Sequence, residues 1–600
     1  MARNNKSEVF PPESEVFTKF ASRRSVVHST RGMVACSQPL AAKCGIEILE
    51  KGGNAADAAV AVAAGLNMTE PCSTGIGGDM FCLYYDAGTG SVSALNGSGR
   101  SGGDCTLDKI RSSLGIPDGT TGKIPMSSVH AVTVPGAAAG WVDTVERFGS
   151  GKLTMSDILA PAIRLGEEGF PVSELTAYYV TQWQRAEKTI RSASPNYAEM
   201  LKSTPSGPRA PRAGEIITLP HLARTFRTLA TEGKPGFYTG RIATELISVV
   251  SSLGGHLTLS DLSHHASVSS SERVHPISLP FGALRVWEHP PNGQGIVALM
   301  ALDILQSLPG FSALPPSAHN STAYLHAVIE SLRLAFADAS WFVTDPDPAF
   351  SPPDLTERLL SPSYLASRAA LFSPDKPLPP TLEHGNPFPS PALSSSDTVY
   401  FAVADSAGNA ISFINSNYGG FGTCIIPKGC GFTLQNRGAN FSLDRKHPNR
   451  LAPRKRPYHT IIPGLVTYDG EEGKGGGLHS VFGVMGGFMQ PQGHVQALLG
   501  QVMGGLNPQQ ALDAPRICIG AGMPDEGDVF DMTVFVEEGM PEETVRGLRE
   551  LGHKVEVVSG YGRGLFGRGQ IIRWTRDEVE GTGVWSAGSD PRADGAAYPL

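Results

Sequence analysis

Paired cysteines and clustered metal ligands are missing from this sequence of 600 residues. Its eight cysteines include no C-x-x-C pair, and it contains no H-E-x-x-H motif or clustered Cys/His spacing. Because such patterns signal zinc sites and disulfide frameworks, we expect neither a metal ion nor a disulfide scaffold. Buried free thiols in a reducing compartment fit the cysteine count best. Nothing else in the sequence indicates a cofactor.

Long apolar runs and a strong net charge are also missing. The stretch Ala59–Leu66 is too short for a membrane span, which needs about 20 apolar residues. The N-terminal residues mix charges with prolines and lack the apolar core of a secretory signal. A net charge of −8 provides no basic surface for nucleic acid or an anionic membrane. We therefore expect a soluble cytoplasmic or otherwise intracellular protein without nucleic-acid or membrane partners.

One local stretch is strongly positive although the total charge is negative. We expect it to form a solvated loop, and a rim that attracts an anionic substrate is the alternative. Its basic residues are Arg445, Lys446, Arg450, Arg454, Lys455 and Arg456.

The abundant residues predict a folded, loop-rich α/β or α+β enzyme. Glycine (70) and proline (46) are frequent and dispersed, and hydrophobic residues make up 40% of the chain. Asn54 is expected to cap an alanine-rich helix, with Asp57 near its positive end. Further helices are predicted at Ala138–Phe148, Met155–Glu168, Leu219–Glu232, Gly240–Leu253 and Thr322–Ala335, and strands at Met80–Tyr85, Lys554–Ser559 and Gln570–Trp574.

A proline- and serine-rich segment precedes a predicted hairpin. Prolines crowd positions 374–391 and serines follow, so residues 373–397 should form an extended, poorly packed, disordered arm. Thr398–Ala404 and Ala410–Ile414 have strand patterns and are joined by a turn. A plain linker between two domains would explain this composition. A hairpin directly after such an arm is also where a protein could place a new N-terminus.

Residues 562–567 match the G-x-G-x-x-G pattern of dinucleotide sites. That pattern holds a pyrophosphate only where a helix begins directly after it. Because a strand is predicted at Gln570–Trp574 instead, we expect no nucleotide to bind there.

A series of short motifs runs along nearly the whole chain. They are Gly52–Ala58, Gly75–Asp79, Val134–Gly136 with Gly140 and Trp141, Asp397 and Thr398, Asp405, Gly408–Ala410, Gly486 and Gly487, Asp513–Arg516, and Gly588–Arg592. Each motif alone could be a turn or a cap. Together and in this order they resemble the γ-glutamyltranspeptidase (glutathione hydrolase) family, from residue 26 to residue 600.

The resemblance implies an α+β fold, the four-layer αββα sandwich of Ntn-hydrolases, built from one self-cleaved precursor. The cut would fall between Asp397 and Thr398. After a polar N-terminal arm (1–25), a large piece would span 26–397 and a small catalytic piece 398–600. The two pieces would stay associated, while the arm at 373–397 would leave the active site after the cut.

The resemblance also implies the catalytic residues. Thr398 would be the nucleophile, and its own α-amine, with a reference pKa of about 7.7–8.0, would be the base once the cut has freed it. Ser416 stands where the family has a threonine that hydrogen-bonds the nucleophile. Gly486 and Gly487 match the glycines whose N–H groups form the oxyanion hole.

The implied substrate-binding residues depart from the family pattern. Arg100 is the candidate for the arginine that binds the substrate α-carboxylate, but it lies later in its segment than the family's arginine. Asn440 takes the place of the acidic group for the substrate α-amine, and Arg437 replaces a glutamine or glutamate. His459 and Thr460 replace a pair of serines.

These changes leave three functions open, and the loop at 441–457 also looks too short to form the family's lid. The first function is a γ-glutamyltransferase or glutathione hydrolase that passes a γ-glutamyl group to water, an amino acid or a peptide. The second is an acylase of the same scaffold that cleaves glutaryl-like or other acyl amides. The third is an unprocessed pseudoenzyme that serves as a binding scaffold.

Overall fold

The hairpin predicted after the proline-rich arm lies in the middle of a sheet in the computed structural model. Its strands are β10 (Asp397–Ala404) and β11 (Ala410–Tyr418), which pair antiparallel. In the turn between them, Asp405 Oδ1 accepts hydrogen bonds from the backbone N–H groups of Ala407 and Asn409. A side chain that binds its own turn in this way fixes where the chain reverses.

The structure describes residues 24–120, 122–178, 183–268, 270–379, 397–470, 476–520 and 532–600. Most of the predicted N-terminal arm, residues 1–23, and residues 380–396 of the predicted proline-rich arm lie outside these ranges. None of the described helices is both long enough and apolar enough to cross a membrane.

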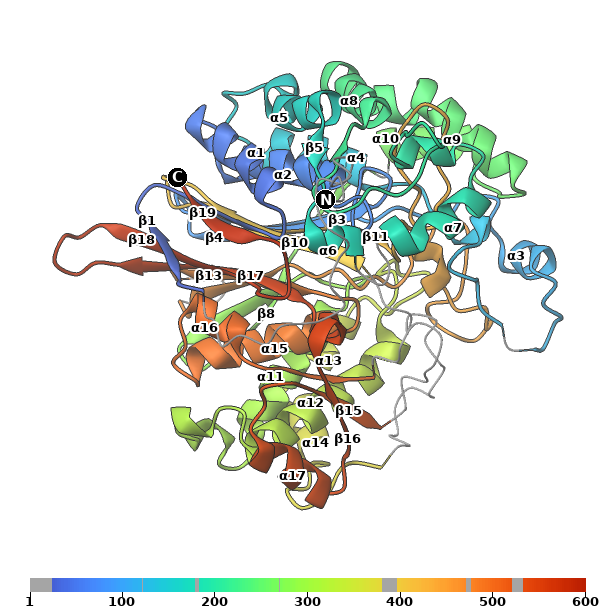
Figure 1. Cartoon of the computed structure of the whole chain (residues 1–600). Helices are drawn as coiled ribbons and strands as arrows, with labels where there is room; N and C mark the ends of the chain where they lie inside the picture. The colour runs from blue at the N-terminus through green and yellow to red at the C-terminus, as the bar shows by residue number, and fades with distance from the viewer. Residues whose placement is uncertain are drawn as a thin grey trace, which may run out of the picture.

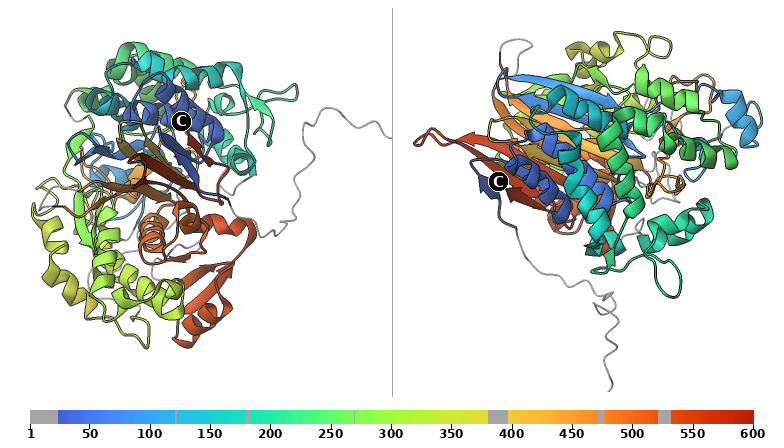
Figure 2. Two further views of the ribbon diagram at one scale, coloured as in Figure 1. Left: turned by 90° about the vertical axis from the view of Figure 1, so that its left-hand side faces the viewer. Right: turned by 90° about the horizontal axis from the view of Figure 1, so that it is seen from above.

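Two seven-stranded antiparallel sheets of the described residues lie face to face (Figures 1 and 2). Sheet I has the order β19 (Ala596–Pro599), β2 (Met33–Cys36), β10, β11, β3 (Asp79–Asp86), β4 (Ser91–Gly97) and β7 (Glu272–Val274). Sheet II has the order β1 (Val27–Ser29), β18 (Gly583–Ser589), β17 (Arg568–Arg576), β13 (Leu478–Met485), β12 (Gly464–Tyr468), β9 (Leu284–Glu288) and β8 (Ile277–Phe281). Two small sheets contain β14 (Ile517–Ile519), β15 (Thr533–Glu537) and β16 (Lys554–Val558), and β5 (Phe170–Pro171) with β6 (Ile216–Ile217).

Helices cover the outer face of each sheet, which gives the predicted αββα layers (Figure 1). The layer on the side of sheet I contains α1 (Pro39–Glu50), α2 (Ala55–Thr69), α4 (Ala137–Phe148), α5 (Met155–Glu168), α6 (Glu174–Tyr178), α7 (Trp183–Ala193), α8 (Pro220–Tyr238), α9 (Arg241–Ser252) and α10 (Leu259–Ser267), with α3 (Leu107–Ser113) at its edge. The layer on the side of sheet II contains α11 (Gly295–Ser307), α12 (Thr322–Phe342), α13 (Leu355–Leu359), α14 (Pro362–Ala369), α15 (Met489–Val502), α16 (Pro508–Asp513) and α17 (Glu542–Glu550).

Apolar side chains fill the spaces between these layers. Between the two sheets, Phe81 and Tyr400 of sheet I pack in one cluster with Val481 and Ile572 of sheet II. Helix α2 is buried along its whole length, and its many alanines let it lie close to sheet I and to α1. The burial of apolar area in these layers is the main favourable term in folding.

The predicted helices are confirmed, with small changes at their ends. Asn54 caps α2, and Asp57 completes a capping box with it. Helix α8 continues to Tyr238 through a kink at Gly233, whose φ is +60°. Helix α12 continues to Phe342, beyond its predicted end. Because the helix is buried on most sides, no change between polar and apolar residues in the sequence marks where it ends.

The G-x-G-x-x-G segment does not begin an α-helix. Residues 560–566 form a 3₁₀ turn, and β17 follows directly at Arg568. The eight cysteines are all free and buried, as predicted, and burial raises the pKa of the Cys82 and Cys518 thiols to about 12. The segment and the thiols are therefore part of the packing of the fold.

The chain before Thr398 and the chain after it contribute to the same two sheets. In sheet I, β10 pairs with β2 on one side, and its hairpin partner β11 pairs with β3 on the other. In sheet II, β12 pairs with β9, and β18 pairs with β1. A cut at residue 397 would leave these ladders in place, so the pieces would remain one folded body.

We expect Asn54→Ala to lower the free energy of unfolding by about 1 kcal/mol, because it removes the cap of a buried helix. The Asn54 side-chain oxygen accepts hydrogen bonds from Ala56 and Asp57, and its Nδ2 donates to the Phe148 carbonyl at 2.6 Å. Asn54→Ser keeps the capping oxygen and should recover part of the loss. Urea unfolding followed by tryptophan fluorescence measures both variants, and an unchanged midpoint for Asn54→Ala would contradict the expectation.

Candidate active site

Thr398 lies at the start of β10, fully buried, opposite an irregularity in β11. Its Oγ1 is 3.0 Å from Ser416 Oγ. The strand register shifts between Asp397 and Val399, so that β11 has one more residue than β10 at this point. Such a bulge redirects a side chain locally and is common beside active sites. Here the bulge places Ser416, the predicted hydrogen-bond partner, beside Thr398, the predicted nucleophile.

Arg437 connects this hydroxyl pair to Thr460. Its Nη2 donates to Ser416 Oγ at 3.3 Å and its Nη1 donates to Thr460 Oγ1 at 2.7 Å. The guanidinium carbon lies 4.1 Å from the centre of the Tyr418 ring. Arg437 is fully buried and forms no ion pair with any residue that the structure describes. Burial lowers the pKa of Arg437 to about 10, although Tyr418 and Asp79 act in the opposite direction.

Asp79 and His459 form a buried pair beside this group. His459 Nε2 lies 3.0 Å from Asp79 Oδ2, and the N–H of Ile461 points to His459 Nδ1, so His459 donates to the carboxylate. Burial raises the pKa of Asp79 to about 6. Burial and the charge of Arg437 hold the pKa of His459 well below its usual range. His459 is therefore a neutral donor at physiological pH.

Asp79 is a site residue that the motif analysis quoted without giving it a role. Its Oδ1 accepts hydrogen bonds from the backbone N–H groups of Gly99 and Gly136 and from Gln435 Nε2. It also pairs directly with Ser416 across β3 and β11. Its place at the end of the Gly75–Asp79 motif was the available signal, because glycines beside an acid allow close backbone approach.

The Gly486–Gly487 turn lies between the end of β13 and the start of α15. Both glycines have positive φ, +128° and +60°, which favours glycine there. Backbone N–H groups at a helix N-terminus favour nearby negative charge, so the turn can stabilise an oxyanion. Gln294 fixes it, because its Nε2 donates to the Gly487 carbonyl at 2.8 Å and to the Thr460 carbonyl at 2.9 Å. Sequence reasoning missed Gln294, which stands in no quoted motif.

Arg100 does not join this hydrogen-bonded group. Its Nη2 donates to Glu272 Oε1 at 2.7 Å, and Glu272 Oε2 accepts from Arg456 Nη1 at 2.9 Å. These two arginines hold the pKa of Glu272 at about 2, against the effect of its burial. The predicted role of Arg100 in carboxylate binding stays a prediction, and its guanidinium is engaged by Glu272 in this structure.

The positive stretch at 445–456 is only partly a solvated loop. Arg445 is half exposed and pairs with Asp108 and Asp118. Lys455 and Arg456 are buried, which corrects the expectation for these two residues. Lys455 Nζ donates to the Arg450 carbonyl at 3.0 Å, and burial lowers the pKa of Lys455 to about 7.

Asn440 is held by Tyr458 and by the loop at 441–457, which was expected to be too short to form the family's lid. Its Nδ2 donates to the Tyr458 carbonyl at 3.0 Å, and Asn449 Nδ2 donates to the Asn440 carbonyl at 2.7 Å. The N–H of Ser442 donates to Asn449, and the N–H of Leu451 donates back to Ser442. Residues 442–451 thus close on themselves, and the absence of a lid stays a prediction.

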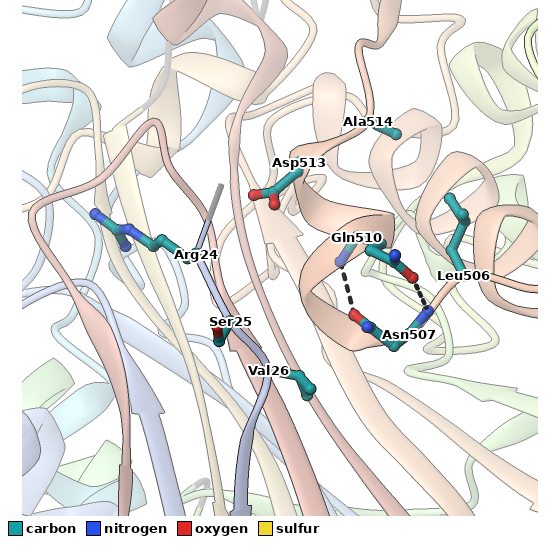
Figure 3. Close-up of a pocket in the computed structure, with 8 residues that line it drawn as sticks. All are labelled: Arg24, Ser25, Val26, Leu506, Asn507, Gln510, Asp513 and Ala514. Carbon is teal, nitrogen blue, oxygen red and sulfur yellow. Dashed lines mark hydrogen bonds between the residues drawn. The ribbon is translucent and has the colours of Figure 1, made fainter. Parts of the chain in front are cut away.

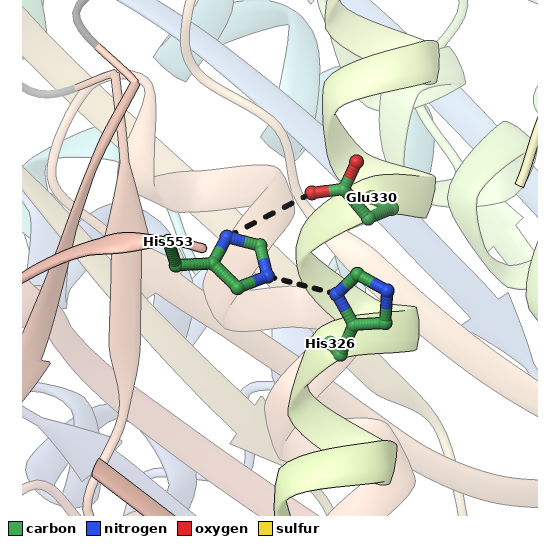
Figure 4. A group of neighbouring side chains, drawn as sticks. All are labelled: His326, Glu330 and His553. Carbon is green, nitrogen blue, oxygen red and sulfur yellow. Dashed lines mark hydrogen bonds and ion pairs between the residues drawn. The ribbon is translucent and has the colours of Figure 1, made fainter. Parts of the chain in front are cut away.

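One group of described residues has the composition of a metal site, but its atoms are already engaged. His326 and Glu330 project from α12 towards His553 (Figure 4). His326 Nδ1 is 2.8 Å from His553 Nε2, and Glu330 Oε1 accepts from Arg333 Nη1 at 2.5 Å. Because the guanidinium of Arg333 supplies the positive charge that faces Glu330, the group fits an internal hydrogen-bond network better than a metal ion.

A surface pocket of about 520 Å³ lies elsewhere, between the residues before β1 and helix α16 (Figure 3). Arg24 lines one side, and Asn507, Gln510 and Asp513 line the other. Asn507 and Gln510 bond each other in the capping box of α16. None of the pocket's residues belongs to the hydrogen-bonded group around Thr398.

The residues around Thr398 therefore form one continuous chain of hydrogen bonds. It runs from Thr398 through Ser416 and Arg437 to Thr460, and Gln294 extends it to Gly487. Two antiparallel sheets between two helical layers, with a buried threonine hydroxyl at the start of a central strand, have the architecture of the Ntn-hydrolase class of amidohydrolases and acyltransferases.

Comparisons with known proteins agree with this class. The sequence model of the gamma-glutamyltranspeptidase family matches residues 41–600. The chain is 35% identical to the glutathione hydrolase-like YwrD proenzyme of Bacillus subtilis, over 96% of this chain and 100% of that protein. It is 31% identical to the oxamate amidohydrolase proenzyme of Klebsiella pneumoniae, over 95% and 98%. The solved cephalosporin acylase from Bacillus halodurans superimposes with a TM-score of 0.82 at 39% identity, over 99% of both chains.

The chain belongs to the γ-glutamyltranspeptidase family. It is an amidohydrolase or acyltransferase with the Ntn-hydrolase fold, as the resemblance implied. Both named enzyme groups, glutathione hydrolases and acylases, occur among its relatives.

We expect Gln294→Leu to slow amide turnover by about 10- to 100-fold, because it removes the amide N–H groups that bind the Gly487 and Thr460 carbonyls and so hold the Gly486–Gly487 turn in place. Gln306→Leu is the matched control, since Gln306 lies at the far end of α11 and bonds the Pro280 carbonyl near the surface. The values of kcat/KM for a chromogenic amide measure the effect. Equal values for the two variants would contradict a role of Gln294 in holding the turn.

Proposed function

We propose that the chain cuts itself between Asp397 and Thr398 and then uses Thr398 as an N-terminal nucleophile on amides. The hydrogen-bonded group of Thr398, Ser416 and Arg437 is the observation that carries this proposal. The relatives described as proenzymes support the cut. The interleaved sheets support it too, because both pieces would keep their places.

The cut and the later reaction use the same hydroxyl. Thr398 Oγ1 attacks the carbonyl carbon of Asp397, the C–N bond between the residues breaks, and the hydroxyl proton ends on the freed nitrogen. Water then hydrolyses the ester and restores the Thr398 hydroxyl. In turnover, the freed amine takes the proton of Oγ1, which attacks the donor amide and releases its amine. Water or an amine acceptor then takes the acyl group from Thr398.

We propose that the donor is an amide whose acyl group carries a free carboxylate, such as a glutaryl amide. A buried guanidinium without an ion pair is unfavourable, and a carboxylate of the donor would supply the missing partner bidentately. Arg437 meets this description beside the nucleophile, and its contacts with Ser416 and Thr460 are to neutral hydroxyls. Thr460, which accepts a hydrogen bond from Arg437, follows directly after His459, which is hydrogen-bonded to Asp79.

A γ-glutamyltransferase or glutathione hydrolase is the second candidate. The glutathione hydrolase-like relative favours it, since a γ-glutamyl group also carries a carboxylate. A γ-glutamyl group adds an ammonium, however. Asn440 offers an amide where the family has an acid. The carboxylate of Asp79 already accepts four hydrogen bonds from neighbouring protein groups, so it is not free to bind an ammonium. A donor without an ammonium therefore suits the described charges better.

Self-cleavage has a direct test in the mass of the purified chain. We expect two fragments that break between Asp397 and Thr398, and a single uncut chain for Thr398→Ala, because the variant lacks the attacking hydroxyl. Intact-protein mass spectrometry measures both, with Thr423→Ala as a control at another buried threonine. A folded wild-type chain that stays uncut would overturn the proposal and favour the scaffold function.

Donor choice has a separate test with three p-nitroanilides. We expect glutaryl-p-nitroanilide to be the best substrate and valeryl-p-nitroanilide, which lacks the carboxylate, to be about 10- to 100-fold worse in kcat/KM, because a hydrogen bond to a charged group contributes about 1.5–3 kcal/mol. γ-Glutamyl-p-nitroanilide should lie between them. A preference for the γ-glutamyl substrate would favour the second candidate function. Equal kcat/KM values for the glutaryl and valeryl substrates would contradict the proposal that the site recognises a carboxylate.

A further inference from the structure

Arg437 already contacts the hydroxyl pair in the uncut chain. Its Nη2 lies 3.3 Å from Ser416 Oγ, which in turn lies 3.0 Å from Thr398 Oγ1. Ser416 Oγ also accepts the backbone N–H of Tyr418 at 2.8 Å, which holds it in place. A positive charge therefore acts on the nucleophilic hydroxyl through a single intervening oxygen, before any donor is bound.

Self-cleavage needs such help more than turnover does. Before the cut, the nitrogen of Thr398 belongs to a peptide bond and has no lone pair that can serve as a base. The surroundings of the hydroxyl must then favour its deprotonated form. A positive charge within a few ångströms lowers the pKa of an acidic group, and burial strengthens this effect because water does not screen the charge.

The charge of Arg437 remains available for this role. Among the described groups that face it, Asp79 of β3 is the one acid that affects its pKa, and Asp79 is bonded to Gly99, Gly136, Gln435 and His459. Tyr418 of β11 presents its ring to the guanidinium, and burial raises the pKa of its phenol, so it stays neutral. The neutral His459 adds no charge.

We propose that Arg437 is a positioning residue for self-cleavage that acts on Thr398 through Ser416. This inference rests on the proposed self-cleavage and extends Arg437 from donor binding to the maturation of the chain. In the first step, negative charge develops on Thr398 Oγ1 as it gives up its proton, which ends on the freed Thr398 nitrogen, and Oγ1 then attacks the Asp397 carbonyl carbon. Ser416, hydrogen-bonded to the guanidinium, orients that oxygen and stabilises the charge. Arg437 itself neither gains nor loses a proton.

The experiment follows the cut in freshly synthesised chains. Cell-free translation is stopped, and aliquots of the full chain are transferred to buffers from pH 6 to pH 9.5 and sampled over time on a gel. The variants are Arg437→Lys, which keeps the charge, and Arg437→Met, which keeps apolar bulk without charge. Arg445→Met is the matched control, because Arg445 is half exposed and pairs with Asp108 on the surface.

We expect Arg437→Met to cut about 10- to 100-fold more slowly than the wild type, with its pH profile moved to higher pH, because the hydroxyl pair loses its positive neighbour. Arg437→Lys should cut faster than Arg437→Met, and Arg445→Met should match the wild type. Equal rates for the Lys and Met variants, or a wild-type rate and profile for Arg437→Met, would overturn the inference.

One further measurement keeps the outcomes distinct. The same Arg437 variants in the uncut Thr398→Ala chain report on folding through their thermal unfolding midpoints. If Arg437→Met does not fold there, Arg437→Gln, which keeps polar bulk without the charge, takes its place, and a wild-type rate and pH profile for Arg437→Gln would overturn the inference. An uncut wild-type chain would instead overturn the proposed function, whereas an unaffected Arg437→Met would leave that function intact.

Discussion

The pairing of β10 in the centre of sheet I is the constraint on which the site depends. A nucleophile that frees itself from a peptide bond becomes a chain end, and chain ends usually fray. Here β11 pairs with β10 along nearly its whole length, β2 pairs with its second half, and sheet II covers its inner face. Thr398 would therefore keep its place after the cut, and the bulge opposite it keeps Ser416 within hydrogen-bond distance.

The electrostatics of the site follow from one buried cation. Removing Arg437 from water is unfavourable, and its pKa reflects that burial. The fold compensates with hydrogen bonds to two hydroxyls and an aromatic ring, which leave the formal charge unmatched among the described residues. In the proposed function, this charge beside Thr398 would stabilise a negative oxygen during self-cleavage and the carboxylate of the amide substrate during turnover. One buried guanidinium would therefore serve both proposed events.

Local sequence patterns predicted the elements, and ordered motifs predicted the layers. Asn54, the hairpin after residue 397 and the strand after the G-x-G-x-x-G segment were all predictable, because caps, turns and periodicity are local properties. The contact between Asp79 and His459 joins segments far apart in the chain, and no local signal encodes it. Lys455 and Arg456 were expected in solvent for the same reason, since the distant Asp345 and Glu272 that accompany their burial cannot be read from composition.

The departures from the family pattern become consistent when they are considered as one change of charge. In the family, an arginine and an acid receive the two charges of a γ-glutamyl group. In this chain Arg100 is paired with Glu272, Asn440 stands where the resemblance places the acid, and the carboxylate of Asp79 already accepts hydrogen bonds from its own neighbours. Among the residues that the structure describes, the hydrogen-bonded group around Thr398 then contains one cation, Arg437, and several neutral hydroxyl and amide groups. Such a site would match an acyl group with a single negative charge, which supports the proposed substrate without an ammonium, with Thr398 as the proposed nucleophile and Ser416 as its hydroxyl partner.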